Sequence, residues 1–135
     1  KNLLLLTVFR LALTFYLVIY SPSFASVVGT GIWCEYTVSR GNNYFEGYFF
    51  TGTDVLFFDG APEKQPRLTE NYRLAEDRIS WKVDNQLKWG RYNFQRNSLT
   101  IQRAGRYPDI LATGKCENAS LQQIKTNTEA LRKQD

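Results

Sequence analysis

Between residues 30 and 117, apolar and polar side chains alternate with a repeat of two, most clearly at 32–39, 78–83, 91–95 and 99–102. This repeat places successive side chains on opposite faces of a β-strand, so that one face is buried and the other is hydrated. The runs are rich in Tyr, Phe, Trp, Thr and Val, which fit a pleated, half-buried surface. The pattern predicts a chain built mainly of short β-strands.

Turn-forming residues such as Gly, Asn and Asp separate these runs at short intervals. The predicted strands, seven or eight in number, lie at 31–39, 44–51, 54–59, 67–75, 78–84, 87–96, 98–104 and 109–116. Short consecutive strands favour an up-and-down antiparallel order, and closure into a barrel leaves no unpaired sheet edges. The predicted fold is therefore all-β, a single antiparallel up-and-down barrel, with a two-sheet sandwich as the alternative.

The pattern changes after Cys116. Ser120-Leu121-Gln122-Gln123 has the form of a helix capping box. Residues at helical spacing then follow, namely Leu121, Ile124, Thr128 and Leu131. An isolated helix of this length is marginal, so it must pack on something. We therefore expect a β-barrel domain at 26–117 and a short C-terminal helix or tail at 118–135.

Residues 1–25 have the layout of a secretory signal peptide. A basic start at Lys1 precedes an apolar centre, and Ser23-Phe24-Ala25 supplies small residues for cleavage. The alternative is an uncleaved membrane anchor. Arg10 would then cost roughly 2.5 kcal/mol or more at the bilayer centre, and the apolar stretch is short for a crossing. The sequence predicts a secreted or periplasmic protein with no membrane span after cleavage.

The charge of the predicted mature chain is close to neutral. Two of the 17 basic residues, Lys1 and Arg10, lie in the signal segment, so 15 basic and 13 acidic residues remain, a net charge of +2. Such a chain has little general attraction for nucleic acid or anionic membranes. Basic residues interleaved with aromatic ones at 91–107 are interpreted as a hydrated strand face rather than a nucleic-acid surface.

The only two cysteines, Cys34 and Cys116, lie 82 positions apart. In an oxidising compartment an even count of two predicts one disulfide. Closing a loop of this size stabilises the fold by up to roughly 4.5 kcal/mol in the chain-entropy model. The alternative, a catalytic free thiol, would have no histidine as its base, because the chain contains none. We therefore predict a structural disulfide.

The residue types present argue against catalysis. Without histidine, the commonest general base and metal ligand is missing. The carboxylates form no metal-binding loop, and no glycine-rich phosphate loop is present. Glu35, Glu46 and Asp54 remain candidates for two-carboxylate glycoside chemistry, with hydrated strand residues as the alternative reading. We expect a protein that is not an enzyme and needs no metal or cofactor.

Aromatic residues are dense between positions 44 and 58. Neighbours on a strand point to opposite faces, so one of two sets must point away from the barrel interior. These sets are Tyr44, Tyr48 and Phe50, or Phe45, Phe49 and Leu56. Either the C-terminal helix covers the outward set, or that set is an exposed patch for a partner. The predicted ligand or partner contacts are Tyr44, Tyr48, Phe50, Phe57, Trp81 and Tyr92.

Gly31-Ile32-Trp33, at the opening of the first strand, resembles the G-x-W of the calycin superfamily, which includes lipocalins and streptavidin-like proteins. The resemblance implies that Trp33 plugs one end of an up-and-down barrel whose other end admits a small ligand. Trp33-Cys34 and the closing Gly114-Lys115-Cys116 are also similar to small exported bacterial proteins with a barrel-closing disulfide. The alternative is a barrel packed solid, because eight strands suit either arrangement.

Two function classes follow from these observations. The leading one is a non-catalytic protein-binding or accessory module of the cell envelope. The alternative is a lipocalin-like carrier of a small apolar ligand. The expected partner is accordingly a protein or a small apolar molecule, and not nucleic acid.

Overall fold

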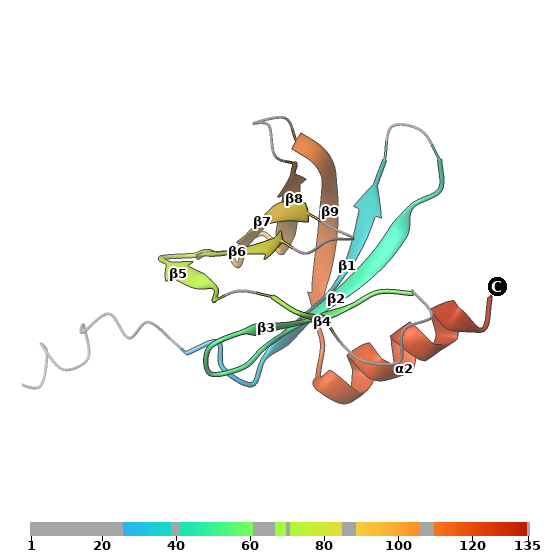
Figure 1. The fold of residues 1–135 in the computed structure, drawn as a ribbon, viewed down its shortest axis with the longest axis horizontal. Helices are drawn as coiled ribbons and strands as arrows, with labels where there is room; N and C mark the ends of the chain where they lie inside the picture. The colour runs from blue at the N-terminus through green and yellow to red at the C-terminus, as the bar shows by residue number, and fades with distance from the viewer. Residues whose placement is uncertain are drawn as a thin grey trace, which may run out of the picture.

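The computed structural model describes residues 26–38, 41–60, 67–69, 71–84, 89–105 and 110–134, and the predicted signal peptide at 1–25 lies outside them. The elements are β1 (Gly31–Thr37), β2 (Tyr44–Phe50), β3 (Val55–Phe58), β4 (Arg67–Leu68), β5 (Arg73–Ala75), β6 (Arg78–Asp84), β7 (Trp89–Gln95), β8 (Thr100–Ala104), β9 (Ile110–Asn118) and α2 (Leu121–Arg132) (Figure 1). Among these residues, no helix combines the length and apolar character that a membrane crossing requires.

All strands belong to one antiparallel sheet, in the order β4-β3-β2-β1-β9-β8-β7-β6-β5. Most strands pair with their neighbours along the chain, and the first strand, β1, also pairs with the last, β9. The two edges, β4 and β5, are therefore consecutive in the sequence. Figure 1 shows the sheet curled into a half-barrel. The predicted all-β, barrel-like fold with a C-terminal helix is confirmed, and one continuous sheet takes the place of the alternative sandwich.

Most predicted strand bounds differ from the observed ones by one or two residues, and two differences have a clear structural cause. The strand expected at 67–75 is two strands, because the chain passes there from one sheet edge to the other. Thr69 stays with β3, since its backbone N–H and its hydroxyl both donate to the Val55 carbonyl at 3.1 Å. The strand expected from residue 98 begins only at Thr100, because Leu99 has a left-handed φ of 54° in the preceding turn.

Apolar side chains on the inner face of the sheet form the main core. At its centre the Tyr48 ring lies 4.9 Å from the Trp81 ring and 5.5 Å from the Tyr92 ring, between centroids. Trp81 and Tyr92 are stacked at 5.5 Å, and Phe50 meets Trp81 edge-on at the same distance. Aromatic pairs in these geometries stabilise a core beyond the area that they bury. The protein's own rings fill this part of the half-barrel.

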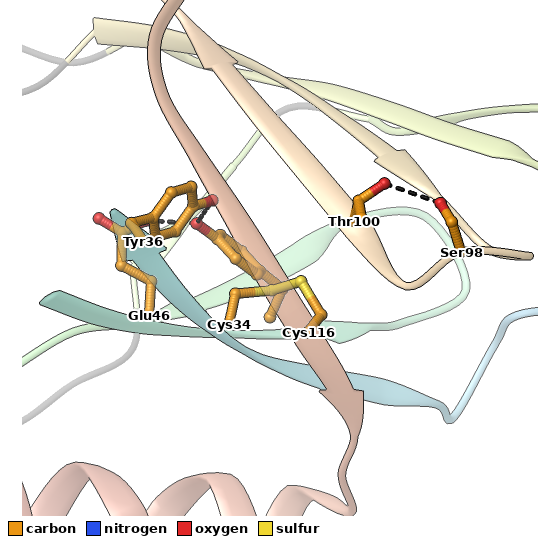
Figure 2. Close-up of a disulfide and its surroundings, with 7 residues drawn as sticks. Cys34, Tyr36, Glu46, Ser98, Thr100 and Cys116 are labelled. Atoms are coloured by element: carbon orange, nitrogen blue, oxygen red, sulfur yellow. Dashed lines mark hydrogen bonds between the residues drawn. A yellow bond between two sulfur atoms is a disulfide. The ribbon is translucent and has the colours of Figure 1, made fainter. Parts of the chain in front are cut away.

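The disulfide joins the first strand of the domain to the last. Cys34 and Cys116 lie directly opposite each other in the β1–β9 pairing, with their Cα atoms 4.0 Å apart (Figure 2). Cys34 is completely buried on the inner face. The predicted disulfide is confirmed, and it crosslinks the one strand pair that joins the two ends of the domain.

Helix α2 begins with the predicted capping box. The Ser120 hydroxyl accepts a hydrogen bond from the Gln123 backbone N–H at 3.1 Å, and the Gln123 side chain accepts one from the Ser120 backbone N–H at 2.8 Å. The helix packs on the outer face of β1, β2 and β3, with Ile124 completely buried. Gly47 makes this close approach possible, because a Cβ atom there would lie 2.6 Å from Ile124 Cγ2.

Trp33 does not plug the barrel, which corrects the expectation drawn from the calycin resemblance. It is 8% exposed, but it lies on the outer face in a second cluster with Phe58 and Ile124. Its indole stacks on the Phe45 ring at 5.9 Å. The physical reason is the repeat of two: Cys34 points into the barrel, so its neighbour points out. Of the two alternative aromatic sets, Phe45, Phe49 and Leu56 point outward and pack in this cluster beneath α2.

Candidate functional site

The six predicted contact residues all occupy inner-face positions, and the structure brings them together. They are Tyr44, Tyr48, Phe50, Phe57, Trp81 and Tyr92. All but Tyr44 are 4% exposed or less, and they pack against one another. Tyr44 is half-buried and stacks on the Tyr36 ring at 4.8 Å. These side chains form a packed interior, in which each of them contacts other side chains of the core.

A carboxylate is buried within this interior. Glu46 is 2% exposed and comes from the same inner-face set of β2 as Tyr48. The Tyr48 hydroxyl donates to Glu46 Oε2, and the Tyr92 hydroxyl lies 3.5 Å from the same oxygen. The Tyr36 and Tyr48 hydroxyls share a further hydrogen bond of 2.7 Å (Figure 2). Donors of this kind offset the cost of removing a carboxylate from water.

Burial controls the protonation of the three phenols in this network. It raises the pKa of Tyr36, Tyr48 and Tyr92 well above the ordinary value, and the nearby Glu46 charge raises each of them further. The pKa of Tyr44 is also raised by burial, against the effect of neighbouring Arg103. The hydroxyls therefore stay protonated and act as hydrogen-bond donors at neutral pH.

Arg103 brings a positive charge to the same region. It lies on β8, directly opposite Tyr92 in the β7–β8 pairing, and its Nη2 donates to the Trp89 carbonyl at 3.5 Å. Gly90 leaves room for it, since a Cβ atom there would lie 3.1 Å from Arg103 Nε. That Nε is buried and finds no acceptor among the described residues. The interior thus holds charges of both signs beside four tyrosines.

The carboxylates proposed as candidates for glycoside chemistry are not brought together. Glu35 is exposed on the outer face of β1, whereas Glu46 points into the barrel from β2. Asp54 lies in the turn before β3. Two-carboxylate chemistry needs both groups on one cavity, and Glu35 and Glu46 lie on opposite faces of the sheet. Within the described ranges, no group of three or more residues is placed to hold a metal ion.

Sequence reasoning did not assign Tyr36 or Arg103 to the site, and it treated Glu46 only as a candidate acid. A signal was nevertheless present. All three residues share a strand face with core residues, because they alternate with them at a spacing of two. A polar side chain on that face is either buried or lies at an end of the barrel. A charged residue at an alternating position whose neighbours in the same set are apolar predicts a buried charge, and this pattern would have identified the network.

The outer face of β5 to β9 is a separate, mainly polar surface, because α2 packs chiefly on β1, β2 and β3. One row of side chains crosses all five strands in direct register: Arg73, Ser80, Asn93, Gln102 and Thr113. Two grooves lie on this outer polar face and share Asn93. One, of about 410 Å³, runs over β7, β8 and β9 and reaches Thr37 at the end of β1. The other, of about 470 Å³, lies over β5, β6 and β7, and we call it the basic groove.

The basic groove contains two cations directly opposite each other. Lys82 and Arg91 are register partners across β6 and β7, and both point outward. Each charged group lies 5.7 Å from the centroid of the Trp89 ring. Lys82 Nζ is also 3.5 Å from the Asp84 carboxylate, and both side chains are 43% exposed. Like charges directly opposite in a sheet repel each other, whereas the Trp89 ring and the Asp84 carboxylate are favourable neighbours of these cations.

Comparisons with known proteins return no relatives. The chain matches no family model, and neither a curated protein nor a solved structure matches it. The calycin resemblance therefore stays a prediction drawn from sequence, and the function has to be argued from the geometry.

Proposed function

We propose that this protein is an exported, non-catalytic binding module of the cell envelope, and that it contacts its partner through the outer polar face of β5 to β9. The observation that carries the proposal is the pair of adjoining grooves on that face. The face is rich in side-chain donors and acceptors, and it lies apart from the strands that the helix covers. Binding sites are commonly concave and offer a few well-placed polar groups.

The packing of the remaining surfaces supports this choice of face. The outward aromatics of β1, β2 and β3 pack in the cluster beneath α2, so they do not form an open apolar patch. The predicted ligand contacts inside the half-barrel pack on one another, which leaves the carrier alternative with less support. The disulfide and the composition of residues 1–25 support export, because disulfides persist in oxidising compartments.

Site-specific photo-crosslinking in the native envelope tests the proposal. A photoreactive amino acid at Asn93, which lines both grooves, should give discrete adducts with one partner. The matched control is the same amino acid at Lys125, an exposed position of α2. Adducts at Lys125 that equal or exceed those at Asn93 would contradict the assignment of the face. Specific adducts at neither position would contradict the binding function.

A further inference from the structure

We infer that the basic groove over β5, β6 and β7 binds an acidic, carboxylate-bearing protein segment. This inference rests on the proposed function and adds the chemistry of the partner. The polar lining of the groove consists of Asn71, Arg73, Ser80, Lys82, Arg91 and Asn93. Two guanidinium groups and one ammonium group therefore surround a hollow of about 470 Å³ whose other polar groups are amides and a hydroxyl.

Positive charge is concentrated on this part of the molecule. The charged side chains on the outer-facing positions of β5, β6 and β7 are Arg73, Arg78, Lys82, Asp84 and Arg91. Four are cationic, and the one carboxylate already pairs with Lys82. The whole sequence carries a formal charge of only +4, so this local excess is not a reflection of a uniformly basic chain. A localised positive patch attracts a complementary negative patch and fixes its orientation.

The juxtaposition of Lys82 and Arg91 contains a repulsion that a bound anion would relieve. Directly opposed like charges lower the stability of an antiparallel pair. A carboxylate placed between the two would remove the repulsion and accept hydrogen bonds from both. Binding sites commonly contain interactions that lower the stability of the unbound protein and that the ligand relieves.

The two aromatic residues that line the groove, Trp81 and Tyr92, are 4% and 0% exposed, so neither offers an open ring to a ligand. Sugars and nucleic-acid bases are commonly bound by stacking on an open aromatic face. The Trp89 ring, which is next to the groove and not part of its lining, already has Lys82 and Arg91 as cation partners. The large hydrophobic residues that are exposed in the described part of the chain, Val28 and Leu111, do not line this groove, so it presents no exposed large apolar side chain that could enter a membrane. Arginine forks and side-chain amides instead suit the carboxylates and backbone of a peptide.

The test is titration of the purified full chain with a synthetic peptide of alternating glutamate and glycine, followed by fluorescence anisotropy. We expect saturable one-to-one binding that weakens as salt is added. Arg91→Glu should weaken it about tenfold or more, the loss typical of one charge-assisted contact. Lys125→Glu on α2 makes the same change in net charge and should leave the affinity unchanged. Equal losses in both variants would overturn the inference, because they would report net charge alone.

A second variant and three competitors complete the design. Arg73→Gln, at the other side of the groove, should also weaken binding, which guards against a folding defect in Arg91→Glu. Dextran sulfate, single-stranded oligothymidylate and phosphatidylglycerol vesicles should bind more weakly than the peptide. Tighter binding of any of them, with the same sensitivity to Arg91→Glu, would overturn the acidic-segment inference in favour of that polyanion. Failure of the peptide with crosslinks retained at Asn93 would overturn this inference alone and leave the proposed function standing.

Discussion

Glu46 lies directly opposite Cys34 in the β1–β2 pairing, and Cys34 in turn lies opposite Cys116 on β9 (Figure 2). A buried carboxylate thus sits one strand away from the disulfide. Its hydrogen bonds to Tyr48 and Tyr92 connect β2 with β7, two strands that are not neighbours in the sheet. The network therefore links opposite walls of the half-barrel across its interior, next to the covalent link between the two ends of the domain.

Removing one donor from this network should be costly. Tyr48→Phe removes the hydrogen bond from Tyr48 to the buried Glu46 carboxylate and the bond between the Tyr36 and Tyr48 hydroxyls, so we expect the free energy of unfolding to fall by about 1.5–3 kcal/mol. Tyr72→Phe is the matched control, because its hydroxyl donates only to the neutral Thr51 carbonyl from a partly buried position. Urea unfolding of both variants measures the difference. An equal loss in the two variants would show that the Glu46 network contributes no special stability.

The buried tyrosines predict a fold that is sensitive to alkali. Their pKa values are raised in the folded state, so this state holds their protons to higher pH than the unfolded chain does. Stability from these groups is fully present below about pH 10 and falls as the pH rises further, by up to about 1.4 kcal/mol per pH unit for each tyrosine. Urea midpoints and tyrosinate absorbance should change together in one transition. Ionisation of all the tyrosines near the ordinary pKa in a chain that stays folded would contradict the prediction.

The disulfide should contribute to folding and not to binding. The double variant Cys34→Ala and Cys116→Ala should lower the free energy of unfolding by about 2–5 kcal/mol. Intact-mass measurement of the untreated protein should show two hydrogens fewer than the reduced form. Peptide affinity measured below the unfolding temperature should be preserved, since the bridge lies on the opposite face of the sheet from the basic groove. Two titratable thiols in the untreated protein would disprove the bridge.

The contact between Gly47 and the helix predicts a strong response to a single added methyl group. Gly47→Ala would place a Cβ 2.6 Å from Ile124 Cγ2 and 3.0 Å from the Trp33 ring, and overpacking of this kind costs about 1–3 kcal/mol. Gly52→Ala, where nothing lies within 4 Å, is the control and should have little effect. Hydrogen exchange of α2 reports whether the helix loosens. If protection of α2 is unchanged in Gly47→Ala, the close packing of helix on sheet is refuted.

Arg91→Glu should stabilise the protein while it weakens peptide binding. The substitution converts the opposed like charges of Lys82 and Arg91 into an attractive pair, which should raise the free energy of unfolding by roughly 0.2–1 kcal/mol. Lys125→Glu removes the same positive charge on the exposed side of α2 and should not produce this gain. Thermal unfolding at low and high salt distinguishes the two, because only an electrostatic gain shrinks with salt. A difference in stability between Arg91→Glu and the unmodified protein that does not change with salt would contradict the predicted repulsion.

Trp33 and Cys34 illustrate the limit of strand periodicity. The repeat of two correctly predicted that these neighbours point to opposite faces, but it does not say which face is inside. The G-x-W resemblance put Trp33 inside. In the structure Cys34 points inward to meet Cys116, and Trp33 is buried by α2 from the other side. Burial of a residue could be predicted from the sequence, but the surface that buries it could not.

The sequence alone predicted most of the strands, the cysteine pairing and the capping box of α2, because each depends on neighbouring residues or on the only available partner. Long-range contacts decided the rest. The pairing of β1 with β9 and the division of residues 67–75 between two sheet edges follow from how the whole sheet curls. Glu46 is buried, and Lys82 is set opposite Arg91, only once register is established across distant strands. The sequence shows the two-residue alternation of side chains within each strand, whereas register and curvature are properties of the assembled sheet.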